Sequence, residues 1–116
     1  QARYETVKAT SEPGKALSRS GIMEAIADLD ETLRHSPFMP VAYYNKGVLL
    51  AECGSYVEAI EALTRAIELK PVFGEAYYNR GFVYLSLGDK SSALPDLSRA
   101  GELGIVAAYP LLKRMK

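Results

Sequence analysis

Two Tyr-Asn pairs are the side chains of this sequence best suited to hold a peptide. Tyr44 is followed by Asn45, and 34 residues later Tyr78 is followed by Asn79. An asparagine amide can both donate to and accept from the main chain of an extended peptide. A tyrosine ring offers a large contact area at a low cost in conformational entropy. The pairs therefore predict peptide binding; the alternative is that the tyrosines only pack against neighbouring helices and the asparagines are solvated.

A second tyrosine precedes each pair, at Tyr43 and Tyr77. Adjacent side chains on one helix point about 100° apart. One ring of each couple can therefore enter a core while the other cannot follow it. The ring left partly exposed is the candidate anchor for a peptide.

No residue of the sequence predicts an active site. His35, the one histidine, falls near an expected helix end and is expected to interact with the helix dipole. Cys53, the one cysteine, can form no intrachain disulfide and is expected to be a buried structural thiol. Carboxylate pairs such as Glu58 with Glu61 are typical of a solvated helix face. The sequence has neither a glycine-rich phosphate loop nor a metal-ligand cluster, so we predict a non-catalytic protein without metal or cofactor.

Length and charge limit the classes of partner. The 116 residues carry 14 basic and 14 acidic side chains, so no global field attracts nucleic acid or an anionic membrane. No apolar run approaches the roughly 20 residues that span a bilayer. The chain begins at Gln1 rather than at methionine, and we interpret it as a processed fragment. We expect a soluble protein, and the sequence leaves its compartment open between cytoplasm and periplasm.

The elements that must position these residues repeat along the chain. Residues 40–71 share their layout with residues 74–107 at an offset of 34 residues. A fixed period in this range is typical of a solenoid. The pairs of identical residues include Ala42 with Ala76, Gly47 with Gly81, Gly54 with Gly88, Ala59 with Ala93, Leu63 with Leu97, Ala66 with Ala100 and Leu69 with Leu103.

Local signals predict the helix ends. We expect a short helix over residues 1–10, a break over 11–14, and a helix from Gly21 to about His35, before Pro37. The next helices run from Pro40 to about Cys53, from Ser55 to before Pro71, and from Gly74 to Gly88. Ser55 and Glu58 are expected to form a capping box, and Asp89 is expected to cap the helix that follows it. Residues 105–116 are expected to form a last helix. Pro110 fits in its first turn only if that helix begins near Val106 or later.

Two glycines indicate close helix contacts. Gly47 and Gly81 fall inside helices, where glycine costs about 1 kcal/mol relative to alanine. We expect that Gly47 lies against Ala59 and Leu63 of the paired helix. Gly81 is expected to lie in the same way against Ala93 and Leu97. By contrast, Gly101 and Gly104 are expected only to weaken the last turn of their helix.

These residues resemble the tetratricopeptide repeat (TPR) family, whose pattern places an aromatic residue, Gly, Ala, a large apolar residue, Ala and Pro at fixed positions. The second unit matches with Tyr43, Gly47, Ala59, Leu63, Ala66 and Pro71. The third matches with Tyr77, Gly81, Ala93, Leu97 and Ala100, but has Ile105 in place of proline. The first matches only in its second helix, at Ala25, Leu29 and Pro37.

The resemblance implies an all-α fold of antiparallel helix hairpins stacked in a right-handed superhelix. We expect one TPR domain over residues 1–116. It would comprise a degenerate first repeat (1–39), a second repeat (40–73), a third repeat (74–107) and a C-terminal capping helix (105–116). Because terminal units of solenoids are usually atypical, we expect the chain to be the C-terminal part of an array.

The resemblance also implies a concave groove formed by the first helix of each unit. By register, the peptide-binding residues would be Tyr44, Asn45, Val48, Glu52, Glu75, Tyr78, Asn79 and Phe82, flanked by Val41 and Ser86. The carboxylate clamp of chaperone-binding members needs Lys, Asn and Arg at particular inner positions. Tyr44, Val48 and Glu75 occupy those positions here, so we do not predict binding to chaperone tails of the EEVD type.

Three functions remain to be compared. The leading hypothesis is a protein-interaction module that holds an extended peptide or a partner helix in the groove. The second is a structural cap or spacer of a larger TPR protein that self-associates through its basic, apolar last helix. The third, a helical-repeat binder of nucleic acid, is disfavoured because the sequence has no basic stripe.

Overall fold

The computed structural model describes residues 18–115 as a row of α-helices. They are α2 (Arg19–His35), α3 (Pro40–Glu52), α4 (Tyr56–Leu69), α5 (Gly74–Ser86), α6 (Lys90–Glu102) and α7 (Ala108–Arg114). The helix and break predicted over residues 1–14, and Lys116 of the last predicted helix, lie outside the described residues.

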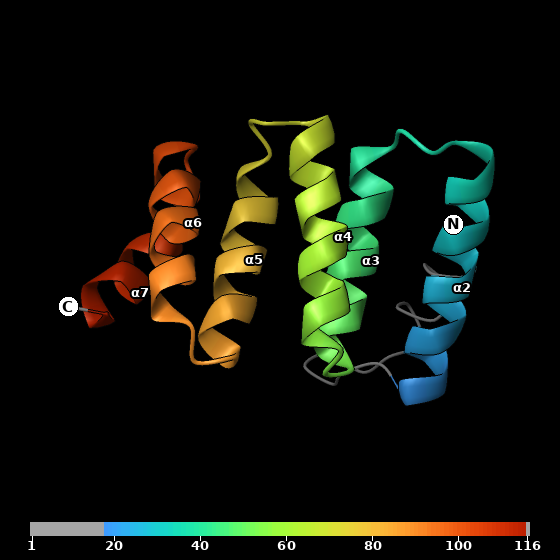
Figure 1. Cartoon of the computed structure of the whole chain (residues 1–116), viewed down its shortest axis with the longest axis horizontal. Coiled ribbons are helices and arrows are strands. Elements are labelled where there is room, and N and C mark those ends of the chain that lie inside the picture. The colour runs from blue at the N-terminus through green and yellow to red at the C-terminus, as the bar shows by residue number, and fades with distance from the viewer. Residues whose placement is uncertain (1–17, 116) are drawn as a thin grey trace.

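From α2 to α6 each helix packs antiparallel against the next along the row, and α7 packs obliquely against α6 (Figure 1). In addition, α3 contacts α5 across the hairpin boundary. Amphipathic helices bury their apolar stripe only against a neighbour, and here the paired helices α3–α4 and α5–α6 do so. The predicted all-α stack of helix hairpins is confirmed.

Glycines in the left-handed region end three of the helices. Gly54 and Gly88 have φ values of 85° and 79°, as predicted, and Gly104 has a φ of 97°. After Gly54, the amide of Ser55 donates to the carbonyl of Leu50 at 2.9 Å, the six-to-one bond of a Schellman motif. The bonds after Gly88 and Gly104 repeat this pattern. Gly104 was predicted only to weaken α6; instead it stops the helix at a defined place.

The two predicted side-chain caps have different outcomes. Asp89 accepts a hydrogen bond from the amide of Ser92 at 3.1 Å, which confirms it as the cap of α6. Hydrogen bonding from the Ser92 side chain, then from the Ser92 amide and the Ser91 side chain, lowers the pKa of the Asp89 carboxyl group. The cap therefore stabilises the fold above the unfolded-state pKa and is lost as the pH falls through the lower folded value. The capping box of Ser55 with Glu58 is wrong, because Ser55 makes no side-chain cap bond. The Ser55 hydroxyl oxygen instead lies 3.6 Å from the sulfur of Cys53.

The last helix is shorter than predicted. It begins at Ala108 rather than at residue 105, because the turn after Gly104 occupies residues 105–107. Pro110 falls in its first turn, as predicted. Since α3, α5 and α7 begin at residues 40, 74 and 108, α7 has the register of a further first helix. Gly101 leaves room for α7 to pack, because a Cβ at this position would lie 3.0 Å from the Tyr109 ring. The Tyr109 hydroxyl donates to the Gly101 carbonyl at 3.0 Å.

The two mid-helix glycines make close contacts with the predicted leucines. A Cβ on Gly47 would lie 2.7 Å from Leu63 Cγ and 3.2 Å from the carbonyl oxygen of Ala59. A Cβ on Gly81 would lie 2.9 Å from Leu97 Cγ. Leu63 and Leu97 are both completely buried. Glycine at these positions therefore sets how closely the helices of each hairpin approach.

Gly47→Ala is expected to destabilise the protein although alanine favours helix. Overpacking a filled core costs about 1–3 kcal/mol, against a gain of about 1 kcal/mol in helix propensity. We expect a net loss of about 1 kcal/mol, measured by urea unfolding followed by circular dichroism. Shortening the neighbour with Leu63→Ala should reduce the penalty of the glycine substitution. A Gly47→Ala protein more stable than the parent would show that Leu63 can move aside.

Candidate functional site

A cleft of about 300 Å³ lies between the two first helices α3 and α5. Its lining consists of Val48, Ala51, Glu52, Tyr56, Asn79, Phe82, Val83 and Ser86. The two helices are one repeat apart, so the 34-residue offset places Val48 level with Phe82 and Glu52 level with Ser86. The α3–α5 cleft therefore has an apolar wall on both sides and a carboxylate toward one end.

Asn79 is the polar group best placed to hold a peptide main chain. Its side-chain nitrogen donates to the Tyr44 hydroxyl at 3.1 Å and to the Glu75 carbonyl at 2.9 Å. An amide nitrogen has two hydrogens to donate, so both donors are used within the chain. The side-chain oxygen has no hydrogen-bond donor among the described residues. Asn79 can therefore accept from a ligand, whereas the sequence had suggested that it could also donate.

Tyr44 does not line the α3–α5 cleft but positions Asn79, which does. Its ring centroid lies 4.9 Å from that of Phe73, and its hydroxyl accepts the bond from Asn79. The ring is half-buried and does not line the cleft. This arrangement agrees with the packing alternative for Tyr44, because the ring is committed to its neighbours and holds Asn79 in place.

The predicted groove residues thus separate into two groups. Val48, Glu52, Asn79 and Phe82 line the α3–α5 cleft, as does the flanking Ser86, whereas Tyr44, Asn45, Glu75 and Tyr78 do not. Tyr78 lies beside the first group, with its ring centroid 6.3 Å from that of Phe82. Sequence register missed Ala51, Tyr56 and Val83. Val83 shares its repeat position with Leu49, and both are buried core residues.

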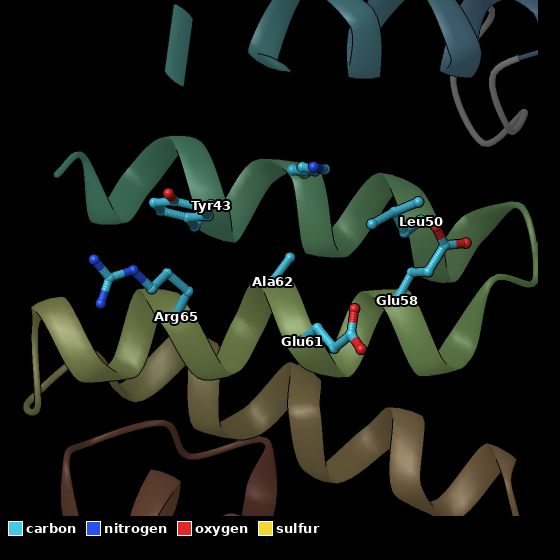
Figure 2. A pocket seen from close by; sticks show the side chains of 7 residues that line it. Tyr43, Leu50, Glu58, Glu61, Ala62 and Arg65 are labelled. Atoms are coloured by element: carbon cyan, nitrogen blue, oxygen red, sulfur yellow. The ribbon is translucent and has the colours of Figure 1, made fainter. Parts of the chain in front are cut away.

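A second cleft, of about 200 Å³, lies between the paired helices α3 and α4 and holds mixed charges. Figure 2 shows its side chains projecting from both helices. Its lining consists of Tyr43, Lys46, Leu50, Glu58, Glu61, Ala62 and Arg65. Lys46 pairs with Asp30 of α2 at 2.7 Å, so this cation is already neutralised. Glu58 and Glu61 are exposed, as predicted.

An ion pair fills the equivalent place in the next hairpin. Arg80 donates two hydrogen bonds of 2.7 Å to the carboxylate of Asp96 and one of 3.0 Å to the hydroxyl of Thr64. Asp96 is only 5% exposed. Its hydrogen bonds raise the pKa of Arg80, against the opposing effect of burial. The sequence signal, a cation repeated at Lys46 and Arg80, gave no indication that one copy is buried.

A third cleft, of about 460 Å³, opens between α6 and α7. Its lining consists of Leu94, Ser98, Tyr109, Leu112, Lys113 and Met115. α7 has 7 residues where α5 has 13. The shorter helix covers less of α6, and Leu94 remains 49% exposed. The equivalent residue in the preceding hairpin, Ile60, is packed against the core.

The titratable groups considered for chemistry are engaged in local contacts. The Cys53 thiol is half-buried and donates to the Leu50 carbonyl at 3.3 Å. His35 is exposed, with its Nε2 atom 3.0 Å from the Glu31 carboxylate. Among residues 18–115, no group of histidine, cysteine or acidic side chains could hold a metal ion. No helix in the same range is long and apolar enough to cross a membrane.

Comparison with known families agrees with this geometry. A family model described as TPR repeat matches residues 47–88, and a second, described as tetratricopeptide repeat, matches residues 74–103. A crystal structure of MamA superimposes with a TM-score of 0.76 at 29% identity, over 78% of this chain and 54% of MamA. The chain belongs to the TPR family. It is thus an all-α solenoid of the kind used for protein interaction.

Other TPR structures are similar at lower identity. The first TPR domain of Spaghetti (RPAP3), bound to the HSP90 peptide SRMEEVD, has a TM-score of 0.78 at 22% identity, over 83% of this chain and 78% of that one. MamA from Desulfovibrio magneticus has a TM-score of 0.68 at 23% identity, over 71% and 46% of the two chains. The chain therefore spans about half the length of the MamA structures that it matches. A search of curated proteins gave no match.

Proposed function

We propose that this TPR chain is a non-catalytic interaction module that binds an extended peptide of a partner protein in the α3–α5 cleft. The observation on which the proposal rests is Asn79, which lines an apolar cleft and whose side-chain oxygen has no hydrogen-bond donor among the described residues. An extended peptide supplies the missing donor from its backbone, because its amides point to alternate sides.

The α3–α5 cleft is preorganised for binding a peptide backbone. Two hydrogen bonds hold the Asn79 amide in one orientation, so little conformational freedom remains to be lost on binding. Phe82 is 48% exposed and stands beside Val48 and Val83. A ligand side chain placed there would cover apolar surface that water covers now.

A related TPR structure supports peptide binding as a class. The RPAP3 domain is bound to a peptide with the sequence SRMEEVD, in which three of the seven residues are acidic. In this chain, Tyr44, Val48 and Glu75 stand where the chaperone-binding clamp needs Lys, Asn and Arg. We therefore propose a peptide ligand but not an acidic chaperone tail.

Phe82→Ala is expected to weaken peptide binding about tenfold, since truncating an aromatic anchor in an interface commonly costs more than 1 kcal/mol. Asn79→Ala is expected to weaken it about threefold to tenfold, in line with one hydrogen bond. Both effects can be measured on peptides selected from a random heptapeptide library with the parent chain, by comparing dissociation constants.

Phe38→Ala is the matched control, because Phe38 is 72% exposed and does not line the α3–α5 cleft. Circular dichroism should show the same helicity for all three variants. If the selected peptides bind the Phe82 and Asn79 variants as tightly as the parent, the ligand does not occupy this cleft and the proposal fails.

A further inference from the structure

The α3–α5 cleft is acidic although the whole chain is neutral. Glu52 is the one charged residue in its lining. It is exposed, and no cation pairs with it within residues 18–115. The other lining residues are apolar or uncharged. A charge facing an apolar wall is screened less than one surrounded by water, so Glu52 decides which sign of ligand charge is favoured at this end of the cleft.

No lysine or arginine of the described residues lines the α3–α5 cleft. Five of the cations among the described residues pair with carboxylates: Arg34 with Glu31, Lys46 with Asp30, Arg65 with Glu68, Arg80 with Asp96 and Arg99 with Glu102. None of these residues lines the α3–α5 cleft. Lys46 and Arg65 line the separate cleft between α3 and α4, and Figure 2 shows Arg65 there. An acidic ligand in the α3–α5 cleft would therefore meet Glu52 without a lining cation to offset the repulsion.

We infer that the peptide held in the α3–α5 cleft carries a lysine or arginine two positions from an apolar residue. The inference rests on the proposed function and specifies its ligand. The basic side chain pairs with Glu52 beside the Tyr56 ring, and the apolar side chain covers Val48 and Phe82. A cation also interacts favourably with the face of a tyrosine ring.

The spacing follows from the geometry of the two chains. Val48 and Glu52 lie four residues apart on α3, which is about 6 Å along the helix at 1.5 Å per residue. An extended peptide advances about 3.3 Å per residue and returns to the same side every second residue, so its side chains i and i+2 are about 6.6 Å apart. The lining of α5 from Asn79 to Ser86 spans about 10 Å. This length accommodates about three extended residues.

The test compares end-blocked pentapeptides that differ in one feature. The first pair is Gly-Leu-Ser-Lys-Gly and its reverse order Gly-Lys-Ser-Leu-Gly, since the α3–α5 cleft does not dictate chain direction. The second pair replaces lysine by glutamate, and a fifth peptide, Gly-Leu-Lys-Ser-Gly, moves the lysine by one position. Dissociation constants come from NMR titration of the parent chain at low salt, where ion pairs are least screened.

We expect one lysine peptide to bind on the order of tenfold more tightly than either glutamate peptide, because the exchange replaces an attraction by a repulsion. The shifted lysine should lose most of this advantage. Glu52→Gln should reduce the lysine-to-glutamate ratio to below about twofold. The matched control is Glu58→Gln, which removes the same charge from α4 outside the α3–α5 cleft and should leave the ratio unchanged.

The outcomes distinguish the two proposals. If lysine and glutamate peptides bind equally and both are lost in Phe82→Ala, the cleft binds peptides and the charge inference is overturned. A ratio that survives Glu52→Gln, or falls equally with Glu58→Gln, also overturns it. If none of the peptides binds, or if binding is indifferent to Phe82→Ala, the peptide cleft itself fails and the charge inference fails with it.

Discussion

Replacing Asp96 by alanine is expected to lower the free energy of unfolding by about 3–5 kcal/mol, the cost of breaking a buried ion pair by removing one partner. The carboxylate is 5% exposed and receives two hydrogen bonds of 2.7 Å from Arg80. Without it, the guanidinium keeps only its bond to Thr64 in a largely buried place. Urea unfolding followed by circular dichroism measures the loss.

Two controls separate burial from charge. Glu102→Ala breaks an exposed pair with Arg99 on the same helix and should cost less than about 1 kcal/mol. The double variant Arg80→Met with Asp96→Leu removes both charges. It should recover much of the stability, because well-packed apolar residues often replace a buried pair without loss. A loss of stability below about 1 kcal/mol for Asp96→Ala would mean that water replaces the carboxylate as an equally good partner of Arg80.

The same ion pair bears on the candidate site. Arg80 follows Asn79 directly on α5, and its partners Thr64 and Asp96 belong to α4 and α6. The pair therefore holds α5 against both of its neighbours. Since Asn79 lines the α3–α5 cleft from this helix, the pair helps to fix the position of the helix that carries the proposed peptide contact.

Leu63→Ala is expected to lower the free energy of unfolding by about 2–5 kcal/mol, the range for emptying a buried leucine site. Leu63 is completely buried, and it fills the space that Gly47 leaves open. Glycine has no side chain with which to refill a cavity, so the site collapses poorly and the loss should fall toward the upper part of the range. The thermal midpoint and the urea midpoint should both decrease.

Val57→Ala is the control for Leu63→Ala on the same helix, because Val57 is 66% exposed and its truncation should change stability by less than about 0.5 kcal/mol. Adding Gly47→Ala to Leu63→Ala should restore part of the loss, since the new methyl group enters the cavity. A Leu63→Ala protein as stable as the Val57→Ala protein would show that the hairpin closes around the smaller side chain.

The sequence by itself determined the order of the helices and the glycine–leucine contacts within each hairpin. The 34-residue period, with Pro40, Gly54 and Gly88 at its boundaries, predicted where α3 and α5 begin or end. The mid-helix Gly47 predicted its close contact with Leu63. These features are predictable because proline, glycine and apolar spacing act on the local backbone, and a paired helix leaves little choice of neighbour.

Only the tertiary structure decided which groups line the cleft and which charges are buried. Spacing gives the direction of a side chain around its own helix, but the angle between successive hairpins decides which directions meet. That angle brings Tyr44 onto Phe73, commits both donors of Asn79 and leaves Glu52 facing an apolar wall. Packing of α5 against α6 within their hairpin buries Asp96 against Arg80. Local sequence patterns could not reveal this ion pair, because its strength comes from the exclusion of water.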